Sequence, residues 1–168
     1  HQRVARLTAV IALGTHSYME PAEIERLVGV ANGDWAGTYP GMSVVNHEWD
    51  DPAMLVSVGH ISADRIAELS EGRLCQGAEI VINRRVVEAD VALVIGPVFP
   101  HEVVGISGGN KYFIPGVASQ EFIDMTHWVG ALITSSEIIG TTGITPVRAM
   151  INEGAALIPT QRLALCCV

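Results

Sequence analysis

The sequence predicts an α/β fold, and two observations support this. Residues 7–13 and 91–95 are continuous, β-prone apolar runs, which are typical of strands covered on both faces. Segments with helical signals alternate with these and other strand-like segments, without an internal repeat. We therefore expect a Rossmann-like, mostly parallel sheet with flanking helices.

Four segments carry helix signals, at residues 21–28, 62–69, 119–133 and 146–153. Pro21 at the first helical position and Gly29 after the last position delimit the first helix. Ser119 and Thr145 are the expected N-caps of the last two helices, and Gly154 is expected to end the final one.

The remaining segments are expected to be short strands or loops. The strand candidates are residues 43–46, 54–58, 78–83 and 163–168. Glycine-rich stretches after Gly29 and at residues 105–116 are expected to be loops. In the helix expected at 119–133, His127 lies well off the apolar stripe. That stripe consists of Phe122, Met125, Val129, Leu132 and Ile133.

Composition excludes several classes of protein. Hydrophobic residues make up 49% of the 168 residues and charged residues 17%, which favours a globular domain over a disordered chain. The formal net charge is -8 and the ten Lys and Arg are scattered, so nucleic acid and anionic membranes are not expected partners. No apolar run approaches the roughly 20 residues of a membrane helix.

The cysteines indicate a reducing environment. Cys75, Cys166 and Cys167 are odd in number and form no Cys-x-x-Cys pair, so we expect no disulfide framework. Disulfide-free chains are typical of the cytosol, and we expect a cytoplasmic protein.

Two of the six histidines hold positions that suggest chemistry. His16 and His101 each follow an apolar strand through a corner that contains Gly or Pro. Side chains at the carboxyl ends of strands converge on ligands in open α/β sheets. On position alone, a turn histidine that is hydrogen-bonded to solvent explains each of them equally well.

Residues 107–111, Ser-Gly-Gly-Asn-Lys, have the composition of an anion cradle. Asn110 and Tyr112 flank Lys111, so the full phosphate-loop pattern is missing and a surface turn remains an alternative. Neither a Ser/His/Asp order nor a His-Glu-x-x-His zinc helix is present. Glu48, Asp50 and Asp51 are better explained as a solvated turn than as a catalytic pair.

Taken together, these motifs resemble the N-terminal domain of the nickel-dependent lactate racemase family. Lys111 follows His101 by ten positions and His127 follows Lys111 by sixteen, in the order and spacing of that family. The resemblance covers nearly the whole chain except an apparent insertion around residues 62–76. The matching segments are residues 14–16, 45–47, 83–90, 96–101, 105–111, 115–116, 126–127 and 145–147.

The resemblance implies a cofactor and its attachment. Family members use a nickel-pincer nucleotide, the pyridinium-3-thioamide-5-thiocarboxylic acid mononucleotide with Ni(II). Lys111 matches the lysine that tethers it, and His127 matches the histidine that completes a square-planar nickel site. Ser107, Gly108 and Gly109 would let the main chain lie close to this cofactor. The enzymes that make and mature the cofactor are then implied partners.

The resemblance also implies an activity, which is racemisation or epimerisation of a small-molecule 2-hydroxyacid. His16 and His101 match the paired acid/base residues of the family. Near neutral pH, each would act as the base for one enantiomer and as the acid for the other. The pyridinium ring would take up and return the hydride. Ser17, Ile106 and Thr126 depart from the usual family residues, so the sequence does not name the substrate side chain.

We expect residues 1–156 to be a cofactor-binding domain truncated at its N-terminus, and residues 157–168 to begin a connection to a missing C-terminal domain. Two other functions remain open. One is a non-catalytic nickel or nucleotide binder of the same family. The other is a zinc hydrolase that uses His16, His47 and His101.

Overall fold

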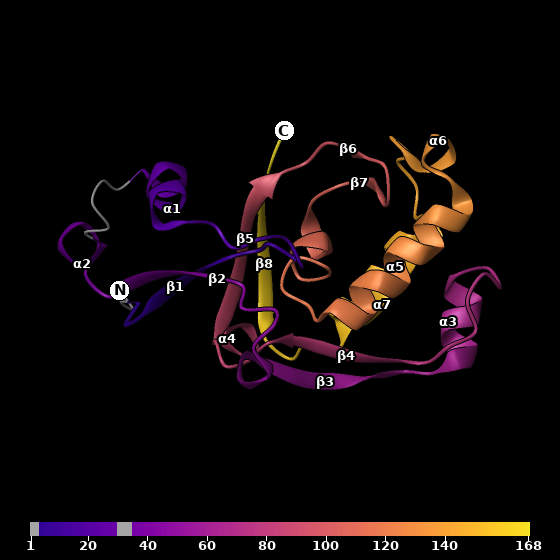
Figure 1. Cartoon of the computed structure of the whole chain (residues 1–168), viewed down its shortest axis with the longest axis horizontal. Coiled ribbons are helices and arrows are strands. Elements are labelled where there is room, and N and C mark those ends of the chain that lie inside the picture. Colours follow the sequence, from indigo (N-terminus) through magenta and orange to yellow (C-terminus); the bar gives the residue numbers. More distant parts are fainter. Residues whose placement is uncertain (1–3, 30–34) are drawn as a thin grey trace.

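The computed structural model of the chain describes residues 4–29 and 35–168 (Figure 1). Two pairs of parallel strands confirm the predicted α/β class. β1 (Leu7–Ile11) pairs with β2 (Met42–Asn46), and β5 (Val91–Pro97) pairs with β8 (Gln161–Cys167). Each pair is a separate two-stranded sheet.

Among the described residues, the connection from β1 to β2 contains two helices. α1 (Pro21–Val28) has the predicted bounds and ends at Gly29, which adopts the left-handed conformation with φ 76°. α2 (Trp35–Thr38) is a helical turn within the stretch that was predicted to be a loop. Residues 30–34 of that stretch lie outside the described residues.

β3 (Leu55–Ile61) and β4 (Ala78–Asn83) are antiparallel, unlike the strands of the two parallel pairs. The helix between them, α3 (Ala63–Leu69), lies beyond the end of the two strands instead of crossing their face (Figure 1). Arg65 of α3 forms an ion pair with Glu153 at 2.9 Å, which holds α3 against the last helix of the chain. The connection therefore reverses the direction of the chain, so that β4 runs antiparallel to β3 instead of parallel to it.

Short elements flank these strands. The 3-10 turn η2 (Pro52–Met54) precedes β3, and α4 (Arg84–Val87) follows β4. After β5 come β6 (Pro100–His101) and β7 (Gly105–Ile106), which pair with each other in the antiparallel direction.

The C-terminal half supplies most of the core. α5 (Gln120–Ile133) packs against α7 (Pro146–Ala156) and β4, and α6 (Ser135–Ile138) follows α5. Phe122 and Val129 of the predicted stripe are buried, whereas Leu132 is 48% exposed. Fully buried side chains at the centre of this core include Ile80, Ile82, Ile114, Phe122, Met150 and Ile151.

Gly154 does not end the last helix as predicted, because it lies inside α7 and is buried. A Cβ at this position would lie 2.7 Å from Ile114 Cδ1 and 3.2 Å from Phe122 Cε1. Gly154 therefore serves close packing of α7 against the core, and the helix continues to Ala156.

Within residues 4–29 and 35–168, no helix has both the length and the apolar character needed to cross a membrane. Cys75, Cys166 and Cys167 are free thiols, and all three are exposed.

Candidate active site

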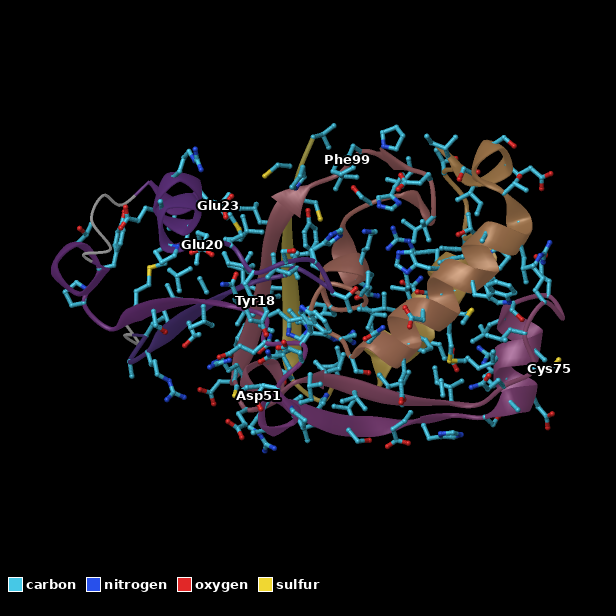
Figure 2. All side chains as sticks on the ribbon, viewed as in Figure 1. Tyr18, Glu20, Glu23, Asp51, Cys75 and Phe99 are labelled. Atoms are coloured by element: carbon cyan, nitrogen blue, oxygen red, sulfur yellow. The ribbon has the colours of Figure 1, made fainter. Side chains whose placement is uncertain are left out.

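The segment that carries Lys111 follows the carboxyl end of β5. The chain passes through β6 and β7 and enters the 3-10 turn η3 (Gly109–Tyr112), which lies within the stretch that was predicted to be a loop. Figure 2 shows Phe99 where the chain turns away from β5. The ring of Phe99 lies 6.3 Å from the ring of His101, measured between centroids.

Ser107 holds this segment in place. Its hydroxyl accepts a hydrogen bond from Phe99 N at 2.9 Å and is 3.4 Å from Pro97 O, to which it donates. Its backbone N–H donates to Phe99 O at 2.8 Å. The hydroxyl and the backbone N–H of Ser107 are thus both used within the protein.

Gly108 and Gly109 both have positive φ values, of 85° and 57°, which favour glycine. A Cβ on Gly108 would lie 2.6 Å from Val98 Cγ2, so only glycine fits there. A Cβ on Gly109 would meet no atom within 4 Å. The main chain at Gly109 therefore faces open space beside Lys111.

Lys111 is partly buried, and this burial lowers the pKa of its ammonium group. The carboxylate of Glu102 opposes that shift, and the charge of Arg148 reinforces it. A lowered pKa increases the fraction of neutral amine, which is the nucleophilic form of lysine.

His127 lies on the exposed side of α5. Its Nδ1 is 2.8 Å from Ile123 O, and because a carbonyl accepts only, Nδ1 carries the proton. The lone pair of Nε2 therefore remains available. Metal-ligating histidines are commonly oriented in this way, with the second ring nitrogen bonded to a carbonyl.

His101, at the end of β6, is held mainly neutral. Burial lowers its pKa most, the charge of Lys111 lowers it further, and the carboxylate of Glu102 opposes them. His127 and Arg148 also lower it, so both side chains lie within electrostatic range of the His101 ring. Nδ1 accepts a hydrogen bond from Val103 N at 3.1 Å, so the neutral ring carries its proton on Nε2.

His16 is exposed and belongs to the loop after β1. Its N–H donates to Leu13 O at 3.2 Å, and its carbonyl accepts from Trp49 Nε1 at 3.1 Å. Gly14 N donates to Gly116 O at 2.9 Å, which ties this loop to the segment that follows η3. The structure therefore joins the His16 loop to the Lys111 segment through the main chain.

His47 differs from the other candidates because it is fully buried. Its Nε2 is 3.0 Å from Ala118 O, to which it donates, and its Nδ1 is 3.0 Å from Asn83 Nδ2, from which it accepts. Burial lowers its pKa. Both ring nitrogens are engaged, and in the part of the chain that the structure describes no three His, Cys, Asp or Glu side chains group as a metal site. The zinc-hydrolase interpretation is therefore wrong in its use of His47.

Sequence reasoning missed Arg148 on α7. Its guanidinium donates to the carbonyls of residues 106–108, which precede Lys111 by three to five positions, and burial lowers its pKa. The Thr-Pro-Val motif at 145–147 was the only signal near this residue.

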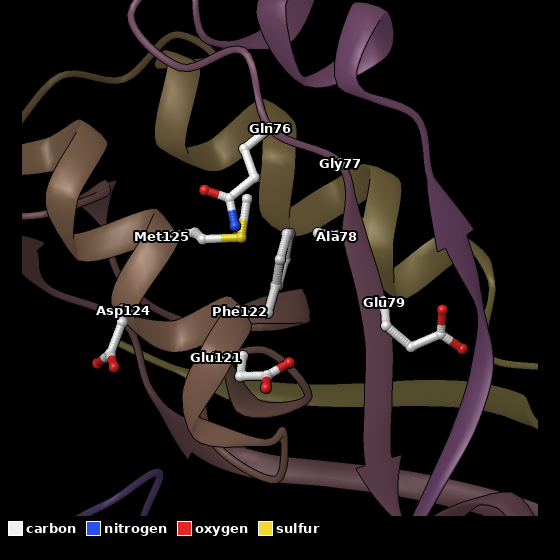
Figure 3. A pocket seen from close by; sticks show the side chains of 8 residues that line it. All are labelled: Gln76, Gly77, Ala78, Glu79, Glu121, Phe122, Asp124 and Met125. Carbon is white, nitrogen blue, oxygen red and sulfur yellow. The ribbon is translucent and has the colours of Figure 1, made fainter.

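A cavity of about 390 Å³ lies elsewhere, between the start of β4 and the first turns of α5. Figure 3 shows the side chains of Gln76, Phe122 and Met125 around a common space, with the carboxylate of Glu79 turned away from it. His101, Lys111 and His127 do not line this cavity, so it is separate from the candidate active site. Its lining residues are Gln76, Gly77, Ala78, Glu79, Glu121, Phe122, Asp124 and Met125.

Comparison with known proteins identifies the family of this chain. The family described as lactate racemase N-terminal domain matches residues 2–140. The chain belongs to this family. Over 123 residues it is 31% identical to the lactate racemase of Lactiplantibacillus plantarum, a match that covers 73% of this chain and 24% of that protein. Over 56 residues it is 41% identical to the lactate racemase of Thermoanaerobacterium thermosaccharolyticum, which covers 33% of this chain and 13% of that protein.

Solved structures of lactate racemase and of a further protein share the fold. A protein from Thermotoga maritima superposes with a TM-score of 0.84 at 32% identity, over 96% of this chain and 38% of its own. The lactate racemase apoprotein of Thermoanaerobacterium thermosaccharolyticum superposes with a TM-score of 0.74 at 21% identity, over 98% of this chain and 35% of its own. The sequence matches cover a quarter or less of the length of the curated lactate racemases, and the structural matches cover 35% and 38% of the solved chains.

Proposed function

We propose that a protein containing this chain is a 2-hydroxyacid racemase or epimerase, in which this domain holds a nickel-pincer nucleotide. Lys111 would be the tether, His127 the protein ligand to nickel, and His16 and His101 the proton-transfer groups. The observation that carries the proposal is that, in a chain of the lactate racemase family, Lys111 and His127 both lie within electrostatic range of His101.

The residues present fit such a cofactor. His127 offers one free ring nitrogen, and its other nitrogen is fixed by a backbone carbonyl. A metal held by a single protein side chain needs its remaining donors from a bound molecule, which a sulfur-bearing cofactor would supply, and sulfur donors with imidazole in a planar arrangement suit Ni(II). The partly buried amine of Lys111 is suited to a covalent bond, and the open space at Gly109 leaves room beside it.

When bound, the nucleotide would accept the C2 hydride of the substrate and return it. The chain's own residues would manage the hydroxyl proton. A neutral His101 accepts a proton only at Nδ1, where Val103 N–H now donates, so that bond must break as the proton arrives. The exposed ring of His16 would serve as the second proton-transfer group.

The substrate is expected to be a small 2-hydroxyacid whose side chain depends on residues such as Ser17 and Ile106. The cofactor-producing enzymes are proposed partners, and a cytoplasmic location is proposed from the cysteine content. A non-catalytic member of the same family would bind the cofactor without interconverting substrates.

The test uses the full-length protein produced together with the cofactor-making enzymes. Intact-mass and peptide analysis should find a nucleotide adduct on Lys111, and chiral chromatography should show interconversion of a 2-hydroxyacid or sugar acid. Lys111→Ala should remove the adduct. Nickel-dependent racemisation that persists in Lys111→Ala would contradict the tether, and an adduct without any racemisation would identify a binder.

A further inference from the structure

Arg148 makes contacts that the proposed chemistry does not require. From the first turn of α7 its Nη1 donates to Gly108 O at 3.2 Å, and its Nη2 donates to Ile106 O and to Ser107 O, the latter at 3.4 Å. One guanidinium thus holds three consecutive carbonyl groups. In the described part of the chain, no carboxylate lies within ion-pair distance of it.

One of the carbonyl groups that Arg148 contacts is also bonded to the main chain of Lys111. Gly108 O, which accepts from Arg148, also accepts from Lys111 N at 3.2 Å. Arg148 and the main chain of Lys111 therefore share one acceptor. Because a partly buried guanidinium that loses its partners leaves polar groups unsatisfied, this arrangement resists opening.

Asn152 makes a second contact from the same helix. It lies four residues after Arg148 and therefore on the same face of α7. Its Oδ1 accepts from Asn110 Nδ2 at 3.0 Å, and Asn110 directly precedes Lys111. The carbonyl of Asn110 accepts from Phe113 N at 3.0 Å and Ile114 N at 2.9 Å, which closes η3 around the lysine.

We propose that Arg148 and Asn152 are positioning residues that clamp the turn carrying Lys111 from two points on α7. The clamp keeps the lysine amine in its partly buried place, within electrostatic range of His101. Its importance for catalysis rests on the proposed function, in which Lys111 is the tether, but the clamp itself exists without the cofactor.

Loosening the clamp should change the reactivity of the amine in a definite direction. Burial lowers the pKa of Lys111 most, and the charge of Arg148 lowers it as well. A variant that frees the turn reduces the burial, and a variant that also removes the Arg148 charge reduces both effects. In each case the pKa of Lys111 rises toward its ordinary value.

The experiment measures this reactivity in full-length protein made without the cofactor-producing enzymes. Trace acetylation with acetic anhydride across a pH series, followed by mass spectrometry of the Lys111 peptide, gives the midpoint at which the amine becomes reactive. Arg148→Gln should shift the midpoint upward most. Arg148→Lys keeps the charge but cannot hold three carbonyls, and it and Asn152→Ala should give smaller upward shifts.

Arg65→Gln is the matched control, because it removes an arginine contact to Glu153, the neighbour of Asn152 on α7, without touching η3. It should leave the Lys111 midpoint unchanged. A merely structural role for Arg148 would lower the melting temperature and leave the midpoint of the folded variant in place, which would overturn the proposal. If Arg148→Gln does not fold, unchanged midpoints in Arg148→Lys and Asn152→Ala overturn it equally.

The outcome is independent of the tether assignment. Shifted midpoints together with no adduct on Lys111 in matured protein would keep the clamp and reject the proposed function. An adduct on Lys111 together with unshifted midpoints would support the proposed function and reject the clamp.

Discussion

Two histidines show how differently the same side chain is used in two regions of this molecule. His47 joins β2 to β4 and to residue 118, and both of its ring nitrogens are bonded to other parts of the chain. His127 on α5 bonds one nitrogen to its own helix and leaves the other free at the surface. Hydrogen-bond satisfaction therefore separates a structural histidine from a candidate ligand, whereas position in the sequence does not.

The largest effect is expected for the free nitrogen of His127. In protein matured with cofactor, His127→Ala should reduce nickel affinity by more than the roughly 10–100-fold that follows loss of an outer-shell partner. Metal analysis after gel filtration measures it, and the exposed His60, replaced in the same way, is the control. Full nickel retention in His127→Ala would remove the contrast with His47.

The next effect concerns His47 and is one of stability. His47→Gln disturbs the partners of the Ala118 carbonyl and the Asn83 amide in a fully buried place, so the free energy of unfolding should fall by about 2–4 kcal/mol. Urea denaturation measures it. His60→Ala, at a side chain that is 57% exposed, should change stability by less than about 0.5 kcal/mol. Equal losses in the two variants would show that His47 is not a structural junction.

The smallest effect is a pH dependence of stability. Burial lowers the pKa of His47 in the fold, while the unfolded chain binds a proton near the ordinary value of 6.5. Below that pH the unfolded state takes up more protons, so the stabilisation is complete above pH 6.5 and decreases as the pH falls below it. His101 contributes in the same direction. His47→Gln should flatten the slope of unfolding free energy just below pH 6.5, and an unaltered slope would assign it to other groups.

Local sequence signals predicted the helices and strands well. The bounds of α1 and the N-cap positions at Ser119 and Thr145 are confirmed, since capping and periodicity act within a few residues. Strand direction was harder, because the antiparallel pairing of β3 with β4 depends on where α3 packs. Gly154 was misread as a helix end because its small size serves contacts with Ile114 and Phe122, which lie far away in sequence.

In the candidate site, too, some residues were predicted from the sequence and others were found only in the structure. The order and spacing of Lys111, His101 and His127 predict a common site, and in the fold Lys111 and His127 lie within electrostatic range of His101. The roles proposed for them, and for His16, Ser107, Gly108 and Gly109, remain predictions. Arg148 and Asn152 carried no signal of their own, because their partners lie on a loop about 40 positions earlier in the chain.

By itself, then, the sequence determined most of the local elements, the α/β class and the likeness to the lactate racemase family, whose N-terminal domain matches residues 2–140. The tertiary structure decided which strands pair, which histidine nitrogens are free and what holds Lys111 in place. The physical reason is that helix and strand signals are short-range, whereas burial and hydrogen-bond partners come from residues that only folding brings together.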